Sequence, residues 1–353
     1  MIGNALFYEP NMDVPFVSGM RHMNSHERHA SSTMAKYIFN ATYMNCELLE
    51  DANYPVCEYI GGRAFMSCYR LSSISLPQVK YIGTRAFESV GMLLSTPAAI
   101  SCPQCTYVES YAFASANIGE AFFPKLSRIG KYAFEFTPLQ SINFDSCTLI
   151  EDSAFIDCIF SVLDSASFPM LSDIYTYAFA WNYSLLSVNL PEVTFCGTYA
   201  FRDARSLTHA IFPKLKAANA GLFYYCVLLS YLSLPLVSAV YTGAFEGTSA
   251  LTDITLPACT TLYTSAFYRA NGVQTIHIPI CMTIGNYAFT ECSKLKSIYL
   301  TSVSSVPTLG SSAFQNTVRA NYCDVYVPMS LVSDFIVAPN WSFSRISSRI
   351  IGV

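Results

Sequence analysis

Residues 76–87 read Leu-Pro-Gln-Val-Lys-Tyr-Ile-Gly-Thr-Arg-Ala-Phe, and variants of this stretch recur along the chain of 353 residues. Its closing dipeptide Ala-Phe, replaced once by Leu222-Phe223, occurs in register twelve times at intervals of 21 to 26 residues, most often 22. A near-constant period of this length is typical of a repeat protein. The repeated phenylalanines are Phe65, Phe87, Phe113, Phe134, Phe155, Phe179, Phe201, Phe223, Phe245, Phe267, Phe289 and Phe314.

Further columns of similar residues become visible when each copy is aligned on its phenylalanine. Proline stands ten residues before it in ten copies, and apolar residues stand eight and five residues before it. The segment ahead of the proline alternates, as in Ser73-Ile74-Ser75-Leu76, which indicates a short β-strand with one buried face. The proline ends that strand because it cannot donate to a ladder. Each repeat is therefore predicted to be a short strand, a turn, a second extended or helical piece carrying the phenylalanine, and a return.

A unit of about 22 residues is too small to bury its own apolar side chains, so the core has to form between stacked coils. We expect a right-handed, curved solenoid of about twelve coils, made of short β-strands, turns and short helical pieces. The twelve phenylalanines are its expected structural core, each ring stacking on those of neighbouring coils. At about 4.8 Å between strands, the rod would be about 55–60 Å long. The expected units are a leader or cap at 1–44, the solenoid at 45–320 and a C-terminal cap at 321–353.

The repeat resembles a known family. The pattern Leu-Pro-x-Val-x-x-Ile-Gly-x-x-Ala-Phe-x-x-Cys-x-x-Leu-x-x-Ile, best seen at 59–74, 76–87 and 284–298, is similar to the BspA-type leucine-rich repeat, also called the Treponema pallidum type. The stretch 324–328, with the residues after it, also resembles the closing strand and short helix of such arrays. The resemblance implies a leucine-rich repeat array in a surface-exposed or secreted protein that binds host or extracellular proteins, and it brings no catalytic motif.

Composition excludes several classes of protein. Only 12% of residues are charged, against about 25% in a typical soluble domain, while 52% are apolar, so the chain is not disordered. The net charge is −4 with no basic run, which speaks against nucleic acid as a partner. No apolar stretch approaches the roughly 20 residues that cross a bilayer, so no membrane insertion is expected. The first ten residues show neither the basic nor the apolar region of a standard secretory signal.

The thirteen cysteines are interpreted as core residues. Eleven of them occupy columns where other repeats place Val, Leu, Ile, Phe, Ala or Thr, and free cysteine packs as a small hydrophobe. A disulfide framework would instead favour a small domain that lacks a core. The segment Cys102-Pro103-Gln104-Cys105 has the spacing of a redox motif, but the repeat itself generates it, because Pro103 belongs to the proline column.

One histidine cluster is a weak candidate metal site. His22, His26 and His29, beside Glu27, could approach one ion if the segment were helical, although a solvated leader is the alternative that we favour. The chain shows no phosphate-binding loop and no nucleophile elbow. We therefore expect no enzyme, no cofactor and no metal.

Two functions remain open. The leading hypothesis is a protein-binding or adhesion solenoid that presents a strand face to a macromolecular partner at a cell surface. The alternative is a structural component of a larger particle or cell envelope, docked through residues 1–44. A third reading, an enzyme with an unrecognised active site, has no polar anomaly in the repeats to support it.

The strand face that would meet the partner consists of the residues fourteen and twelve positions before each phenylalanine. Most are small and polar: Ser73, Ser75, Ser101, Ser141, Asn143, Ser165, Ser167, Ser187 and Asn189. Larger groups break this habit on successive repeats, and clustered aromatic or apolar groups are typical of a contact hot spot. The alternative is variation on a tolerant surface, or cover by a neighbouring loop. The predicted partner-binding residues are His209, Ile211, Tyr231, Asp253 and His277, with Glu120 and Phe122 as a smaller outlier.

Overall fold

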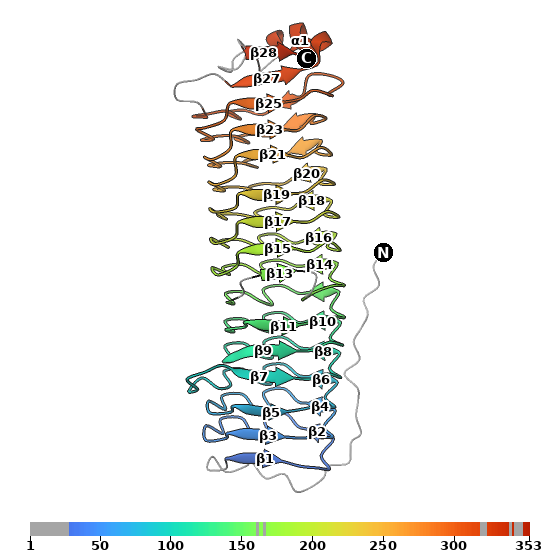
Figure 1. Ribbon diagram of the computed structural model, residues 1–353, viewed down its shortest axis with the longest axis vertical. Coiled ribbons are helices and arrows are strands. Elements are labelled where there is room, and N and C mark those ends of the chain that lie inside the picture. Colours follow the sequence, from blue (N-terminus) through green and yellow to red (C-terminus); the bar gives the residue numbers. More distant parts are fainter. Residues whose placement is uncertain (1–27, 160–161, 165–166, 318–322, 339–340, 342–348) are drawn as a thin grey trace.

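The computed structural model is a tall column of stacked coils (Figure 1). It describes residues 28–159, 162–164, 167–317, 323–338, 341 and 349–353. Three predicted features, namely His22, His26 with Glu27, and Ser165, lie outside the described residues. Within them, thirteen coils contribute two strands each, from β1 and β2 to β25 and β26, and β27 adds a further turn, making about 14 in all. The predicted stacked solenoid is confirmed.

The odd-numbered strands, together with β28, form the first strand face, and every pair of neighbours is parallel. They fall into three sheets, ordered β1-β3-β5-β7-β9-β11, β13-β15-β17-β19 and β21-β23-β25-β27-β28. Their bounds are β1 (His29–Ser31), β3 (Asp51–Asn53), β5 (Ser73–Ser75), β7 (Ala98–Ser101), β9 (Ile118–Phe122), β11 (Ser141–Asn143), β13 (Val162–Asp164), β15 (Ser187–Asn189), β17 (His209–Ile211), β19 (Tyr231–Ser233), β21 (Asp253–Thr255), β23 (Thr275–His277), β25 (Ser297–Tyr299), β27 (Asp324–Val327) and β28 (Ile350–Gly352).

The even-numbered strands from β2 to β26 form the second strand face. Each has two residues, the first pointing outward and the second buried. In β6, for example, Tyr81 is half-buried and Ile82 is buried. They are β2 (Tyr37–Ile38), β4 (Tyr59–Ile60), β6 (Tyr81–Ile82), β8 (Tyr107–Val108), β10 (Arg128–Ile129), β12 (Leu149–Ile150), β14 (Asp173–Ile174), β16 (Phe195–Cys196), β18 (Ala217–Ala218), β20 (Ala239–Val240), β22 (Thr261–Leu262), β24 (Thr283–Ile284) and β26 (Thr308–Leu309).

The third side of the column is the turn face, which carries the Ala-Phe segments. Hydrogen bonds there alternate in direction: the Phe65 amide donates to the Ala86 carbonyl of the next coil at 2.7 Å, and the Met66 amide donates back to the Arg63 carbonyl at 3.3 Å. The residues two before and two after each ring have positive φ, and within the described part of the chain 23 residues other than glycine have φ between 54° and 62°. Left-handed backbone cannot continue a helix of L-residues. The expected helical pieces are therefore wrong for the repeats, which have turns at this position.

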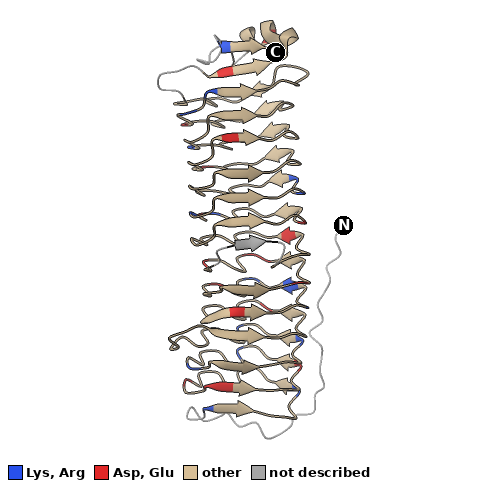
Figure 2. Ribbon diagram, in the orientation of Figure 1, with Lys and Arg blue, Asp and Glu red and all other residues tan. Residues whose placement is uncertain are grey.

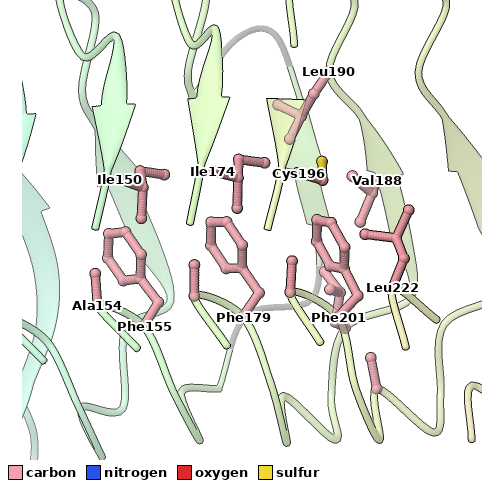
Figure 3. Packing of buried hydrophobic residues seen from close by; sticks show 14 of the residues in the cluster. Ile150, Ala154, Phe155, Ile174, Phe179, Val188, Leu190, Cys196, Phe201 and Leu222 are labelled. Carbon is pink, nitrogen blue, oxygen red and sulfur yellow. The ribbon is translucent and has the colours of Figure 1, made fainter. Parts of the chain in front are cut away.

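The phenylalanines run through the centre of the column (Figure 3). Eleven of the twelve are fully buried, and Phe314 is half-buried. Successive rings lie parallel, with centroids 5.0 to 5.7 Å apart, from Phe65 to Phe314. Tyr43, which lacks a preceding alanine, adds a ring to the stack at 5.1 Å from Phe65. The stack gives neighbouring coils one shared core.

The two ends of the solenoid extend the same pattern. At the N-terminal end, β1 pairs with β3 and β2 with β4, so coil pairing begins before residue 45. At the C-terminal end, β27 is followed by the 3-10 turn η1 (Met329–Leu331) and the helix α1 (Val332–Val337). Buried Trp341 lies 6.3 Å from the Phe314 ring and covers the end of the stack. The three units expected from the sequence stay a prediction.

Candidate binding surfaces

The predicted strand-face residues of β17 and β19 lie side by side. His209 is paired with Tyr231 and Ile211 with Ser233. His209 is exposed, Ile211 is half-buried and Tyr231 is 50% exposed, while Ala210 between them is buried. The His209 and Tyr231 rings are tilted relative to each other, and their centroids lie 5.7 Å apart. The inward and outward alternation predicted for these strands is therefore present, and three of the five predicted residues form one small exposed group.

The other two predicted residues lie apart from that group. Asp253 is exposed on β21, which begins a new sheet after β19. His277 belongs to the second outward column, where it is paired with Tyr299, which is in turn paired with Tyr326. These three rings are stacked at 4.2 and 4.5 Å. The fixed offset from the phenylalanine does not reach Tyr299 and Tyr326, because the interval before Phe314 is 25 residues long and Tyr326 follows the last repeated phenylalanine.

The turn face carries a richer aromatic cluster that sequence reasoning missed. The Tyr177 ring stacks on Trp181 at 5.8 Å and on Tyr199 of the next coil at 5.2 Å. The Arg202 guanidinium lies over three rings, 5.4 Å from Trp181, 5.3 Å from Tyr199 and 5.0 Å from Tyr224. Tyr, Trp and Arg are the residue types enriched in interface hot spots. We call these five residues the turn-face cluster.

Two local features hold the turn-face cluster in place. Asp203 is buried and accepts hydrogen bonds from Arg202 at 3.2 Å and from Arg205 at 2.9 Å, so two guanidinium groups share one carboxylate. Gly221 lies under the Tyr199 ring, since a Cβ at that position would stand 2.1 Å from two ring carbons. The absence of a side chain at Gly221 lets the tyrosine lie flat against the next coil.

The described cysteines lie in the core, and His29 forms an ion pair. All thirteen cysteines are free and buried, which confirms the packing interpretation. Burial raises the pKa of the Cys102 thiol well above its ordinary value and that of Cys105 to about 12, opposing the thiolate that redox chemistry needs. His29 is paired with Asp51. In the described part of the chain, no three His, Cys, Asp or Glu side chains are grouped to hold a metal.

Among the described helices, none has the length and apolar character needed to cross a bilayer.

Comparison with known proteins gives a consistent set of relatives. The model of the "BspA type Leucine rich repeat region" matches in overlapping segments at 36–161, 106–230, 172–279 and 216–334. A leucine-rich repeat protein from Bacteroides ovatus is similar at 20% identity, over 84% of this chain and 83% of that one, with a TM-score of 0.49. A leucine-rich cell surface protein from Faecalibacterium prausnitzii is 18% identical over 77% and 87%, with a TM-score of 0.36. The pneumococcal vaccine antigen PcpA is 16% identical over 74% and 82%, with a TM-score of 0.35. No curated protein matches.

Proposed function

Because the chain belongs to the BspA-type leucine-rich repeat family, we propose that it is a non-enzymatic protein-binding solenoid that acts in adhesion at a cell surface or as a secreted protein. The observation that carries the proposal is the group of His209, Ile211 and Tyr231 on β17 and β19. These larger side chains stand together on a face whose other outward residues are mostly Ser, Thr and Asn. Exposed aromatic and apolar groups placed together are what a protein contact needs.

The strand-face group lies on a face with few charged residues (Figure 2). Figure 2 shows few charged residues on the strands, so a partner would meet little charge to desolvate there. Neighbouring outward side chains are about 5 Å apart along the column, which matches the spacing of extended or flat partner surfaces. Asp253 and His277 extend the proposed contact toward the C-terminal end, through the stacked Tyr299 and Tyr326.

The test compares matched variants of the two aromatic surfaces. The purified protein would be used to capture a partner from candidate host extracts, and its affinity for the identified partner would then be measured. We expect the Ile211→Ser/Tyr231→Ser variant to bind at least tenfold more weakly, since hot-spot residues each contribute on the order of 2 kcal/mol. The control is Tyr183→Ser/Arg205→Ser beside the turn-face cluster, where the Arg205 guanidinium lies 5.8 Å from the exposed Tyr183 ring, and this variant should bind normally. Undiminished affinity of the folded strand-face variant would remove this site, and a loss confined to the control would move it to the turn face.

The structural-component alternative is tested by a shorter truncation than the sequence suggested. Removing residues 1–44 would strip Ala30, Ile38 and Tyr43 from the core of the first coil. Deleting 1–27 leaves that coil intact. Under the adhesion proposal the deletion variant keeps its partner affinity, whereas loss of incorporation into a particle or envelope, with affinity unchanged, supports the alternative. Protease treatment of intact source cells tests the proposed surface location, because a surface protein is cleaved without lysis.

A further inference from the structure

The second strand face contains a hollow of about 350 Å³, lined by Asp173, Tyr175, Thr176 and Phe195. Asp173 on β14 is paired with Phe195 on β16. Tyr175 stands two residues after Asp173, so its position points to the same side, and Gly197 stands two residues after Phe195. Three side chains thus occupy three corners of a square, and the fourth corner has no side chain.

The empty corner is a fixed feature of the fold. A Cβ at Gly197 would lie 2.6 Å from the Thr176 nitrogen and 2.6 Å from the Tyr175 carbonyl carbon. Contacts that short with backbone atoms cannot be relieved by moving a flexible side chain. With the backbone as it stands, a side chain at Gly197 would need the neighbouring backbone to shift, so glycine leaves the space beside the two rings open.

The rings form two walls at right angles. The Tyr175 and Phe195 planes make an angle of 81°, with centroids 5.7 Å apart. Both side chains are well exposed, at 39% and 41%, so neither is part of the buried core. The two rings meet edge to face, and the ring surface that stays exposed beside the hollow can attract a cation, which a ring quadrupole stabilises within about 6 Å of its centroid.

The carboxylate at the third corner supplies a negative charge. Asp173 accepts a hydrogen bond from the Ser172 hydroxyl at 2.5 Å. The ion pairs nearest to it within the described residues use other carboxylates, namely Glu151 with Arg128, Asp152 with Lys131, and Glu192 with Lys214. An arriving cation would therefore meet one carboxylate and the exposed surface of the two rings.

We propose that this hollow binds the ammonium group of a lysine side chain on a protein partner. The apolar stem of lysine would lie against the Phe195 and Tyr175 rings, and the charged end would reach Asp173. This assignment goes beyond the proposed function, because it names a ligand group and places it on a different face. It rests on the proposed function only for the existence of a protein that carries the lysine.

Among the described coils, no other one has this combination of an acidic residue, two exposed rings and a glycine. Tyr241 and Tyr263, in the same column as Tyr175, are also exposed and stack at 4.6 Å, but their planes are nearly parallel, at 6°. The residue two before Tyr263 is Thr261, so no carboxylate stands beside that pair. This second pair is a built-in control for aromatic exposure without the perpendicular walls and the acid.

The test uses the intact protein and a small probe, so that it does not depend on finding a partner. Nα-acetyl-lysine-N-methylamide is titrated into the protein while ring resonances or heat are followed, with the norleucine analogue as a probe that keeps the four-carbon stem but lacks the ammonium group. We expect saturable binding of the lysine probe, weaker at higher salt, and no binding of the norleucine probe. Phe195→Leu should weaken lysine binding about two- to fivefold. Asp173→Asn should weaken it further.

Tyr263→Leu is the matched control and should leave lysine binding unchanged. Equal binding of the norleucine probe, or equal loss in Tyr263→Leu and Phe195→Leu, would overturn the proposal, as would lysine binding that neither Phe195→Leu nor Asp173→Asn affects. Absence of saturable binding also overturns it. The lysine probe does not depend on a partner protein, so this test is independent of the test of the proposed function. Lysine binding can be found even if the strand-face variants reveal no partner, and it can be absent even if they do.

Discussion

The first strand face and the turn face cover the same phenylalanine stack, yet they present different surfaces. On the first strand face, outward residues project in parallel from extended backbone, and most of them are small and polar. On the turn face, left-handed residues two positions before and after each ring direct side chains across neighbouring coils. Arg202 there lies over rings from three consecutive coils. Extended strands thus place each outward side chain beside its counterpart on the next coil, whereas the turns let side chains from different positions of neighbouring coils converge.

The largest expected effect comes from the core that both faces share. Phe201→Ala should lower the free energy of unfolding by about 3–5 kcal/mol, because the buried ring stacks on Phe179 and Phe223. Phe314→Ala should cost less, since Phe314 is only half-buried and has one phenylalanine neighbour. Denaturant unfolding of both variants measures the difference. Equal and negligible losses would show that the stack does not support the solenoid.

The next effect separates the two faces by charge. Asp203→Asn on the turn face should cost about 1–2 kcal/mol, since the buried carboxylate accepts charge-assisted bonds from two arginines that are partly exposed and so partly screened. Asparagine tolerates the left-handed backbone at this position, so the charge is the main change. Asp253→Asn on the strand face should stay within about 0.5 kcal/mol. Thermal melts at low and high salt would compare them, and equal losses would contradict the distinction.

These differences explain what the sequence could and could not predict. Period-two alternation around residues such as Ile74 and Val188 encodes which strand side chains are buried, so most of the first strand face was predictable. The coil before Phe179 is an exception, because its strand is β13 (Val162–Asp164), whereas the fixed offset from the phenylalanine placed Ser165 and Ser167 there. The twelve phenylalanines were visible because one short dipeptide repeats in a fixed register. Tyr43 escaped because its copy lacks the alanine, although its ring continues the stack.

The turn face escaped for a different physical reason. Its backbone alternates hydrogen bonds within the turn with hydrogen bonds to the next coil. Left-handed residues such as Trp181 and Asp203 are not glycine, so no residue type in the sequence indicates the left-handed conformation. The one available signal was the enrichment of tyrosine and arginine at fixed offsets from Phe179, Phe201 and Phe223. The hollow beside Asp173 was equally hidden, because it depends on which residues of adjacent coils are paired.

A glycine substitution should act with opposite signs on the two faces. Ser265 has φ of 56° in a column where Gly221 and Gly243 also occur, so Ser265→Gly should stabilise the protein by about 0.5 kcal/mol, relief of left-handed strain slightly exceeding the entropy cost of glycine. Ser75→Gly, on the extended strand β5, should destabilise it by about 0.5–1 kcal/mol. Paired melting curves measure the signs. Destabilisation by both would mean that the turn backbone is not strained.

The smallest expected effect concerns the strand-face tyrosine itself. Tyr231 is half exposed and touches only the tilted His209 ring among the aromatic contacts of the described residues, so Tyr231→Ser should change the free energy of unfolding by no more than about 0.5 kcal/mol. Tyr199→Ser should cost about 1 kcal/mol or more, because that ring stacks on Tyr177 and lies under Arg202. Side-by-side melts decide the comparison: if Tyr231→Ser costs as much as Tyr199→Ser, the strand-face ring contributes to the fold. If it costs almost nothing, Tyr231 is free to contribute its surface to a partner, whereas the turn-face rings are already engaged in holding their coils together.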